Sequence, residues 1–232
     1  MNLKNKFLFI IPAKGTSERI KNKNIKKLNG MPLIEYTFNF LKKNEINKNV
    51  FLSTESFKIK KIAKKYDINT INRSRKLCRK YTSTEAVLLE VLKKIDFKKK
   101  GYEWIVTLQP TSPFRKISTL KKCIKYAKNK NFDVITTFKK NKDDLWFKNK
   151  NKINRIFPLW PRNQHQRKNV YEETSSIYIN KISKLIETKS MIKGSIKEVI
   201  TKDHENLDIN TIEDFDYCDY ILKSKKLSKY QF

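Results

Sequence analysis

The sequence predicts an α/β fold with a mainly parallel sheet and helices on both of its faces, and three observations lead to this prediction. Short apolar runs alternate along the chain with segments whose apolar residues have helical spacing. Residues 104–108 are apolar at almost every position, as expected of a strand that is buried on both faces. Residues 7–11 are also apolar and lead directly into a small, polar and cationic loop, where such folds bind phosphorylated ligands.

In the first half of the chain, the pattern predicts strands at residues 7–11, 49–54 and 104–108. Helices are expected at residues 33–43, 56–66 and 82–95. Either Thr82 or Ser83 can cap the last of these helices, whose apolar face runs from Val87 through Val91. Such alternation is typical of parallel sheets, because their neighbouring strands need a long crossover connection.

In the second half, Ser118 is expected to cap a helix that runs to about residue 128, and a strand follows at residues 133–138. Further strands are expected at residues 176–180 and 196–200. Thr211 with Asp214 three residues later resembles a capping box, which predicts that the last helix begins here.

The stretch between these elements, residues 145–170, has few helical periods and predicts a hairpin or arm that projects from the sheet. It contains Trp146, Phe147, Phe157 and Trp160 together with two prolines. Exposed aromatic residues on an arm indicate a surface for a partner. The alternative is a surface insertion without a partner, which four aromatic residues make less attractive.

Composition and cysteine usage favour a cytoplasmic protein of one domain. Its 232 residues suffice for one sizeable core, and no apolar run approaches the roughly 20 residues of a membrane span. The polar residues 1–6 lead straight into a strand, which argues against a secretory signal. Three widely spaced cysteines, Cys78, Cys123 and Cys218, suit a reducing compartment better than a disulfide framework.

The formal net charge of +30 raises the question of nucleic-acid binding. The lysines are spread along the whole chain, and no nucleic-acid-binding motif accompanies them. We therefore expect solvated charge without a specific nucleic-acid partner, although weak, salt-sensitive binding to polyanions would fit this composition.

Two regions carry groups suited to nucleotide chemistry. In the loop after the first strand, four cations could neutralise a triphosphate, and the amide of Asn24 could donate a hydrogen bond; the cations are Lys14, Arg19, Lys21 and Lys23. Near the C-terminus, Asp208 and Asn210 alternate around one residue and point to the same side of an extended segment, offering the oxygen ligands that Mg²⁺ prefers. These residues alone leave two other interpretations open: simple solvation of the cations, and an ordinary loop before a helix for Asp208 and Asn210.

Four ordered blocks give a more specific indication. They read IPAKGTSERIKNKN at residues 11–24, LQPTSPFR at 108–115, SIYI at 176–179 and LDINT at 207–211. With these blocks the chain resembles the acylneuraminate cytidylyltransferases, also called CMP-sialic acid synthetases, over nearly its whole length. The resemblance implies one domain over residues 1–232 with a Rossmann-like, GT-A-like nucleotidyltransferase fold. It also implies that residues 139–175 form a projecting arm for homodimerisation and acceptor binding.

The resemblance implies transfer of CMP from CTP to the anomeric hydroxyl of a nonulosonic, sialic-type 2-keto-3-deoxy sugar acid, with release of pyrophosphate and with Mg²⁺ as cofactor. The implied catalytic residues are Lys14, Lys23 and Asp208. The implied nucleotide contacts are Lys14, Gly15, Lys23, Asn24, Arg73, Thr84 and Gln109. Acceptor contacts are expected from Gln109, Arg162 and Arg167, and metal ligands from Asp208 and Asn210.

Several positions depart from the family pattern. The family usually has Arg at position 14, Lys at position 18 and Asp at position 210, where this chain has Lys14, Glu18 and Asn210. It has an Asp-Thr pair where Lys80 and Tyr81 stand. Residues 171–175 read YEETS in place of Tyr-x-x-Asn-Gly, which favours another nonulosonic acid, such as a pseudaminic or legionaminic type, over N-acetylneuraminate.

Two alternatives stay open at this point. One is a 3-deoxy-manno-octulosonate cytidylyltransferase, whose opening loop typically continues into a Gly-Lys-Pro-Leu run that residues 23–25 do not match. The other is a non-catalytic nucleotide- or RNA-binding protein, which the net charge and Asn210 would fit.

Overall fold

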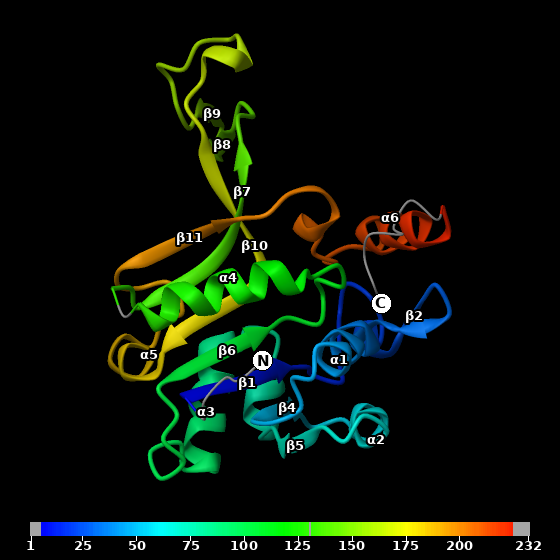
Figure 1. Cartoon of the computed structure of the whole chain (residues 1–232). Coiled ribbons are helices and arrows are strands. Elements are labelled where there is room, and N and C mark those ends of the chain that lie inside the picture. Colours follow the sequence, from blue (N-terminus) through cyan, green and yellow to red (C-terminus); the bar gives the residue numbers. More distant parts are fainter. Residues whose placement is uncertain (1–5, 130, 225–232) are drawn as a thin grey trace.

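The computed structural model describes residues 6–129 and 131–224 and has the predicted α/β architecture. Its central sheet has seven strands in the order β11-β7-β10-β6-β1-β4-β5 (Figure 1). The strands are β1 (Phe7–Pro12), β4 (Val50–Thr54), β5 (Asn69–Asn72), β6 (Trp104–Leu108), β7 (Val134–Asn141), β10 (Val170–Lys181) and β11 (Ile196–Ile200). Only β10 runs antiparallel to its neighbours, β6 and β7, so the mainly parallel sheet is confirmed.

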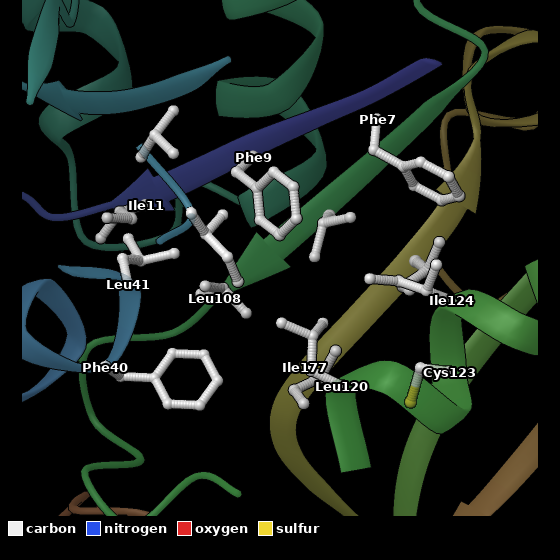
Figure 2. Packing of buried hydrophobic residues seen from close by; sticks show 14 of the residues in the cluster. Phe7, Phe9, Ile11, Phe40, Leu41, Leu108, Leu120, Cys123, Ile124 and Ile177 are labelled. Atoms are coloured by element: carbon white, nitrogen blue, oxygen red, sulfur yellow. The ribbon is translucent and has the colours of Figure 1, made fainter. Parts of the chain in front are cut away.

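Helices cover both faces of this sheet, and the alternation of side chains along β1 shows how. Phe7, Phe9 and Ile11 point into one apolar cluster, where they meet α1 (Leu33–Lys43) and α4 (Ile117–Lys128) (Figure 2). Helix α2 (Phe57–Lys64) contributes Ile59 and Ala63 to the same cluster. Leu8 and Ile10 point into a second cluster, where they meet α3 (Thr84–Ile95) and α5 (Ile182–Thr188). Burial on both faces explains why the strand is apolar at every position.

A third apolar cluster holds the C-terminal part of the described chain against the N-terminal part. Phe215, Cys218 and Ile221 of α6 (Ile212–Lys223) pack there with Leu28 of the short hairpin β2 (Lys27–Leu28) and β3 (Met31–Pro32). Ile209 is fully buried in the same cluster, which fixes the segment that carries Asp208 and Asn210. This packing brings residues from both ends of the sequence to one edge of the sheet.

Helix capping agrees with the sequence at two of three positions. Thr211 and Asp214 form a reciprocal capping box at the start of α6, and the Ser83 hydroxyl accepts the N–H of Ala86 at the start of α3. The prediction that Ser118 caps α4 was wrong. Ser118 lies inside the first turn, the N-cap residue is Lys116, and the Lys116 N–H donates to Glu205 Oε1 at 3.2 Å.

The segment between β7 and β10 extends away from the sheet as an arm (Figure 1). The last residues of β7 pair with the first residues of β10 along it, and β8 (Trp146–Asn149) and β9 (Lys152–Arg155) form a hairpin. Trp146 and Phe147 are about half exposed there, at 51% and 50%, whereas Phe157 and Trp160 stack on each other with ring centroids 4.2 Å apart. The arm therefore presents apolar side chains that it does not itself cover.

The predicted domain of residues 1–232 includes both ends of the chain, which lie outside the described residues. Among the helices of the described part, none is long and apolar enough to cross a membrane.

Candidate active site

A cavity opens at the carboxyl ends of β1 and β6. Its volume of about 720 Å³ is typical of sites that bind small molecules. It brings together eight side chains that the resemblance assigned to the nucleotide or the metal. Six of them are Lys14, Lys23, Asn24, Arg73, Thr84 and Gln109. Asp208 and Asn210 complete the set from a segment almost two hundred residues away. This edge of the sheet is where open α/β folds bind ligands.

Gly15 shapes the loop that follows β1 through a close approach to the start of α2. Its N–H donates to Glu55 Oε1 at 2.6 Å, and a Cβ atom added to Gly15 would lie 2.7 Å from the Cβ of Ser56. The Cβ of Ser56 is bonded directly to the backbone and cannot swing away, so only glycine fits here without moving the backbone. Asn24 closes the same loop from the other side, because its amide donates to the Lys14 carbonyl at 2.9 Å.

We expect Gly15→Ala to raise the KM for the nucleotide that the resemblance implies about tenfold or more, and to cost roughly 1–3 kcal/mol of stability, because the overpacked loop must shift. The double variant Gly15→Ala/Ser56→Gly removes the opposing Cβ and should recover much of both losses. Gly15→Ala/Ser56→Ala keeps that Cβ and serves as the matched control. Steady-state kinetics and thermal unfolding measure both effects, and equal behaviour of the two double variants would contradict the steric explanation.

The Lys23 side chain is half-buried in the wall of the pocket and not fully solvated. Its Nζ donates to the Ile209 carbonyl at 2.7 Å and so ties the short helix η2 (Lys23–Ile25) to the segment that carries Asp208. Burial lowers the pKa of Lys23, and the Asp208 carboxylate opposes this effect. Arg19 also lines the pocket, whereas Lys21 is exposed and does not.

Asp208 and Asn210 lie next to each other on the pocket wall. The Asn210 amide donates to Asp208 Oδ2 at 2.7 Å, and the Ser112 hydroxyl is 3.4 Å from Asp208 Oδ1. Within the described residues, no group of three His, Cys, Asp or Glu side chains could hold a metal ion. One carboxylate and one amide oxygen nevertheless suit Mg²⁺, which is commonly bound by one or two carboxylates with substrate phosphates and water.

Arg73 forms part of the pocket floor and is 5% exposed. Its Nη2 donates to the Ser53 carbonyl at 3.0 Å and its Nε to the Ser53 hydroxyl at 3.3 Å, which orients the guanidinium at the end of β4. Thr84 is the first residue of α3 and faces the same cavity. Both residues therefore stand where a ligand can reach them.

Gln109 reaches the cavity at the end of β6 and is held from behind by a buried arginine. The Arg115 guanidinium donates to the Gln109 carbonyl, to the Ser176 carbonyl at 2.9 Å and to the Thr37 hydroxyl at 3.0 Å. These hydrogen bonds from Arg115 connect the end of β6 with β10 and α1 next to the cavity. The sequence analysis assigned no role to Arg115, although it belongs to one of the four blocks.

The two predicted acceptor arginines do not join this cavity. Arg167 is buried in the arm, where its guanidinium contacts Asp144 at 3.2 Å and the carbonyls of Pro161, Lys142 and Arg162. Arg162 is exposed in the same part of the arm. Neither arginine lines the cavity beside Gln109, and the Arg167 guanidinium is engaged within the arm.

Three further residues in or beside the cavity were given no individual role by the sequence analysis. Glu55 follows β4 directly, and the shared edge of parallel strand ends was a signal that could have identified it. Arg79 adds a cation to the lining from the loop before α3, with no motif to mark it. Ser175 lines the cavity with a φ of 54°, in the irregular stretch of β10 between Glu173 and Tyr178.

A profile of the cytidylyltransferase family matches residues 8–224. The chain therefore belongs to the cytidylyltransferase family and is a nucleotidyltransferase enzyme. This result excludes the alternative of a non-catalytic binding protein.

Similar proteins cover the chain almost from end to end. The Post-translational flagellin modification protein B of Campylobacter coli is 24% identical, covering 98% of this chain and 100% of its own. The CMP-N,N'-diacetyllegionaminic acid synthase of Legionella pneumophila is 26% identical, covering 89% and 91%. The pseudaminic acid cytidylyltransferase of Campylobacter jejuni is 25% identical, covering 94% and 97%.

The fold is also similar to that of a solved CMP:2-keto-3-deoxy-manno-octonic acid synthetase in complex with CTP. The two share a TM-score of 0.68 over 95% of this chain and 99% of the other, with 13% sequence identity. At this identity the likeness establishes the fold, which is that of a Rossmann-like nucleotidyltransferase, but not the acceptor.

Proposed function

We propose that this enzyme transfers CMP from CTP to the anomeric hydroxyl of a nonulosonic, sialic-type 2-keto-3-deoxy sugar acid. The anomeric oxygen would form a bond to the α-phosphorus while the bond from that phosphorus to the α,β-bridging oxygen breaks. Pyrophosphate leaves, and the proton of the attacking hydroxyl passes to water. The observation that carries this proposal is the cavity that joins a cationic loop to the Asp208–Asn210 pair at the carboxyl edge of the sheet.

The cationic wall would neutralise the triphosphate, whose charge must be offset before pyrophosphate can leave. Lys14 and Lys23 are the residues that we assign to this role, with Gly15 and Asn24 shaping the loop around them. Lys14 keeps the charge of an arginine at that position but gives up bidentate contact. Arg73, Thr84 and Gln109 complete the proposed nucleotide contacts.

Asp208, with Asn210, would hold Mg²⁺ in this site, since both present oxygen ligands to the cavity. A bound Mg²⁺ screens phosphate charge and lowers the pKa of a coordinated hydroxyl. The hydrogen bonds from Asn210 and Ser112 orient the Asp208 carboxylate for that task.

The acceptor class rests on the relatives and on the wall of the cavity near β10. Two relatives of almost full length are named for legionaminic and pseudaminic acids. Thr174 and Ser175 replace the Asn-Gly pair that the resemblance leads one to expect, and Ser175 borders the cavity. Both observations favour an acid of the pseudaminic or legionaminic type over N-acetylneuraminate. Gln109 is the acceptor contact that we retain.

Pyrophosphate release from CTP and Mg²⁺ should be measured against a panel of pseudaminic, legionaminic, N-acetylneuraminic and 3-deoxy-manno-octulosonic acids. We expect turnover with one of the first two acids. Turnover with the octulosonic acid alone would replace this proposal with the second candidate function, which the likeness of fold to the octonic acid synthetase favours.

We further propose a cytoplasmic homodimer that associates through the arm. Trp146, Phe147 and Leu159 leave apolar surface uncovered there, with Leu159 96% exposed. Cys78, Cys123 and Cys218 are not disulfide-bonded, which suits a reducing compartment.

Trp146→Ser/Phe147→Ser is expected to shift the protein from dimer to monomer at micromolar concentration, as measured by analytical ultracentrifugation. Phe57, which is exposed on α2 away from the arm, provides the matched control Phe57→Ser, and that variant should stay dimeric. A monomeric wild type, or a double variant that remains dimeric, would contradict the role of the arm.

A further inference from the structure

An ion pair bridges the mouth of the cavity. Lys80 Nζ lies 3.2 Å from Glu18 Oε2, and the two side chains are 59% and 56% exposed. Glu18 belongs to the loop between β1 and η2, whereas Lys80 belongs to the loop between η3 (Arg75–Cys78) and α3. Both residues line the cavity, so the pair connects its two opposite loops.

Glu18 is out of place in the charge pattern of this site. Among the described residues that line the cavity, six are cations: Lys14, Arg19, Lys23, Arg73, Arg79 and Lys80. The acids of the same lining are Asp208, which has an assigned role, and Glu18, which has none. A carboxylate in this position repels a triphosphate and also occupies one of the cations that could bind it.

The ion pair between Glu18 and Lys80 can dissociate easily. Ion pairs between exposed side chains contribute little to stability, so a polyanion can displace the carboxylate easily. Lysine carries its charge on a flexible stem and can turn toward a new partner. The Lys80 ammonium also lies 5.6 Å from the centre of the Tyr81 ring, which is 90% exposed and can follow it.

We propose that Lys80 is a further ligand of the CTP triphosphate, and that Glu18 holds it as an internal counterion until the nucleotide takes its place. This inference rests on the proposed function, because it requires CTP in this cavity. Glu18 then lowers the affinity for nucleotide, and the pair re-forms when pyrophosphate has left. The departures from the family pattern at positions 18 and 80 thus have one explanation, because the two residues form a single ion pair.

Calorimetric titration of the full chain with CTP and Mg²⁺, without acceptor, tests this inference through a double-mutant cycle. Glu18→Gln should tighten CTP binding by about two- to fivefold, and Lys80→Gln should weaken it by a similar factor or more. Glu18→Gln/Lys80→Gln should bind like Lys80→Gln alone. The remote pair of Lys184 and Glu187, whose charged atoms are 3.0 Å apart, supplies the control Glu187→Gln, which should change nothing.

Three outcomes overturn the inference while leaving the proposed function intact. The first is that Lys80→Gln binds CTP as tightly as the wild type does. The second is that Glu18→Gln weakens CTP binding, which would make Glu18 a ligand of the nucleotide or the metal. The third is a gain from Glu18→Gln that persists in full without Lys80, which would indicate general repulsion. A wild type that does not bind CTP at all overturns both the inference and the proposed function.

Discussion

Replacing Asp208 by alanine is expected to reduce turnover of CTP at least about 100-fold while leaving the fold intact. Asp208 is the acid of the cavity that we assign to Mg²⁺, and the single charge of the Asp208–Asn210 pair resides on it. Loss of that charge leaves the phosphates unscreened. The fold should survive, since in the described part of the chain the Asp208 carboxylate accepts hydrogen bonds from two side chains, those of Ser112 and Asn210.

The matched control for this variant is Asp216→Ala, because Asp216 lies exposed on α6 only eight residues further along. It should keep turnover within about twofold, as is usual for surface substitutions. Pyrophosphate release gives the rates, and the unfolding temperature shows whether each variant is folded. Near-normal turnover by Asp208→Ala would remove Asp208 from the proposed metal site.

The second large effect is expected from Lys23→Met, which should lower kcat/KM for CTP by about 100-fold. The Lys23 side chain is half-buried and its ammonium donates to the Ile209 carbonyl, so its charge acts on phosphate with less screening by water than that of an exposed lysine. Lys21→Met is the matched control, because Lys21 stands two residues earlier but is exposed outside the cavity lining.

The lowered pKa of Lys23 also predicts a pH dependence. The protonated amine neutralises phosphate and the neutral amine does not, so kcat/KM should fall as the pH rises through the pKa of Lys23. Because burial lowers that pKa, the fall should begin at a lower pH than for an ordinary lysine. In Lys23→Arg the alkaline limb should move to higher pH, since a guanidinium stays protonated. An unchanged limb would mean that another group titrates.

The elements that the sequence predicted well are those whose pattern reports burial directly. The bounds of α1 and β11 agree with the expected ranges, and β1 extends one residue beyond its range. The edge strand β5 escaped prediction because it pairs on one side only and buries Ile71 alone among its four residues. Helix α5 is short and follows β10 without a turn signal, and the sequence analysis assigned no element to its residues.

The candidate site divides in the same way. Lys14, Gly15, Lys23 and Asn24 lie in one contiguous stretch, and their proximity follows from the sequence alone. The contact of Gly15 with Glu55 depends on how β1 and β4 align, which no local pattern encodes. The predicted acceptor arginines failed to join the cavity for a related reason: nothing near Arg167 in the sequence indicates that Asp144 and three carbonyls engage it within the arm.

The most direct test of the account is to incubate the wild-type protein with Mg²⁺, a pseudaminic- or legionaminic-type acid and each of CTP, UTP, ATP and GTP, and to quantify pyrophosphate and nucleotide sugar by mass spectrometry. The account predicts that pyrophosphate and CMP-sugar appear in equal amounts with CTP and that the other nucleotides give neither. Pyrophosphate without CMP-sugar, or a product formed equally from UTP, would contradict it.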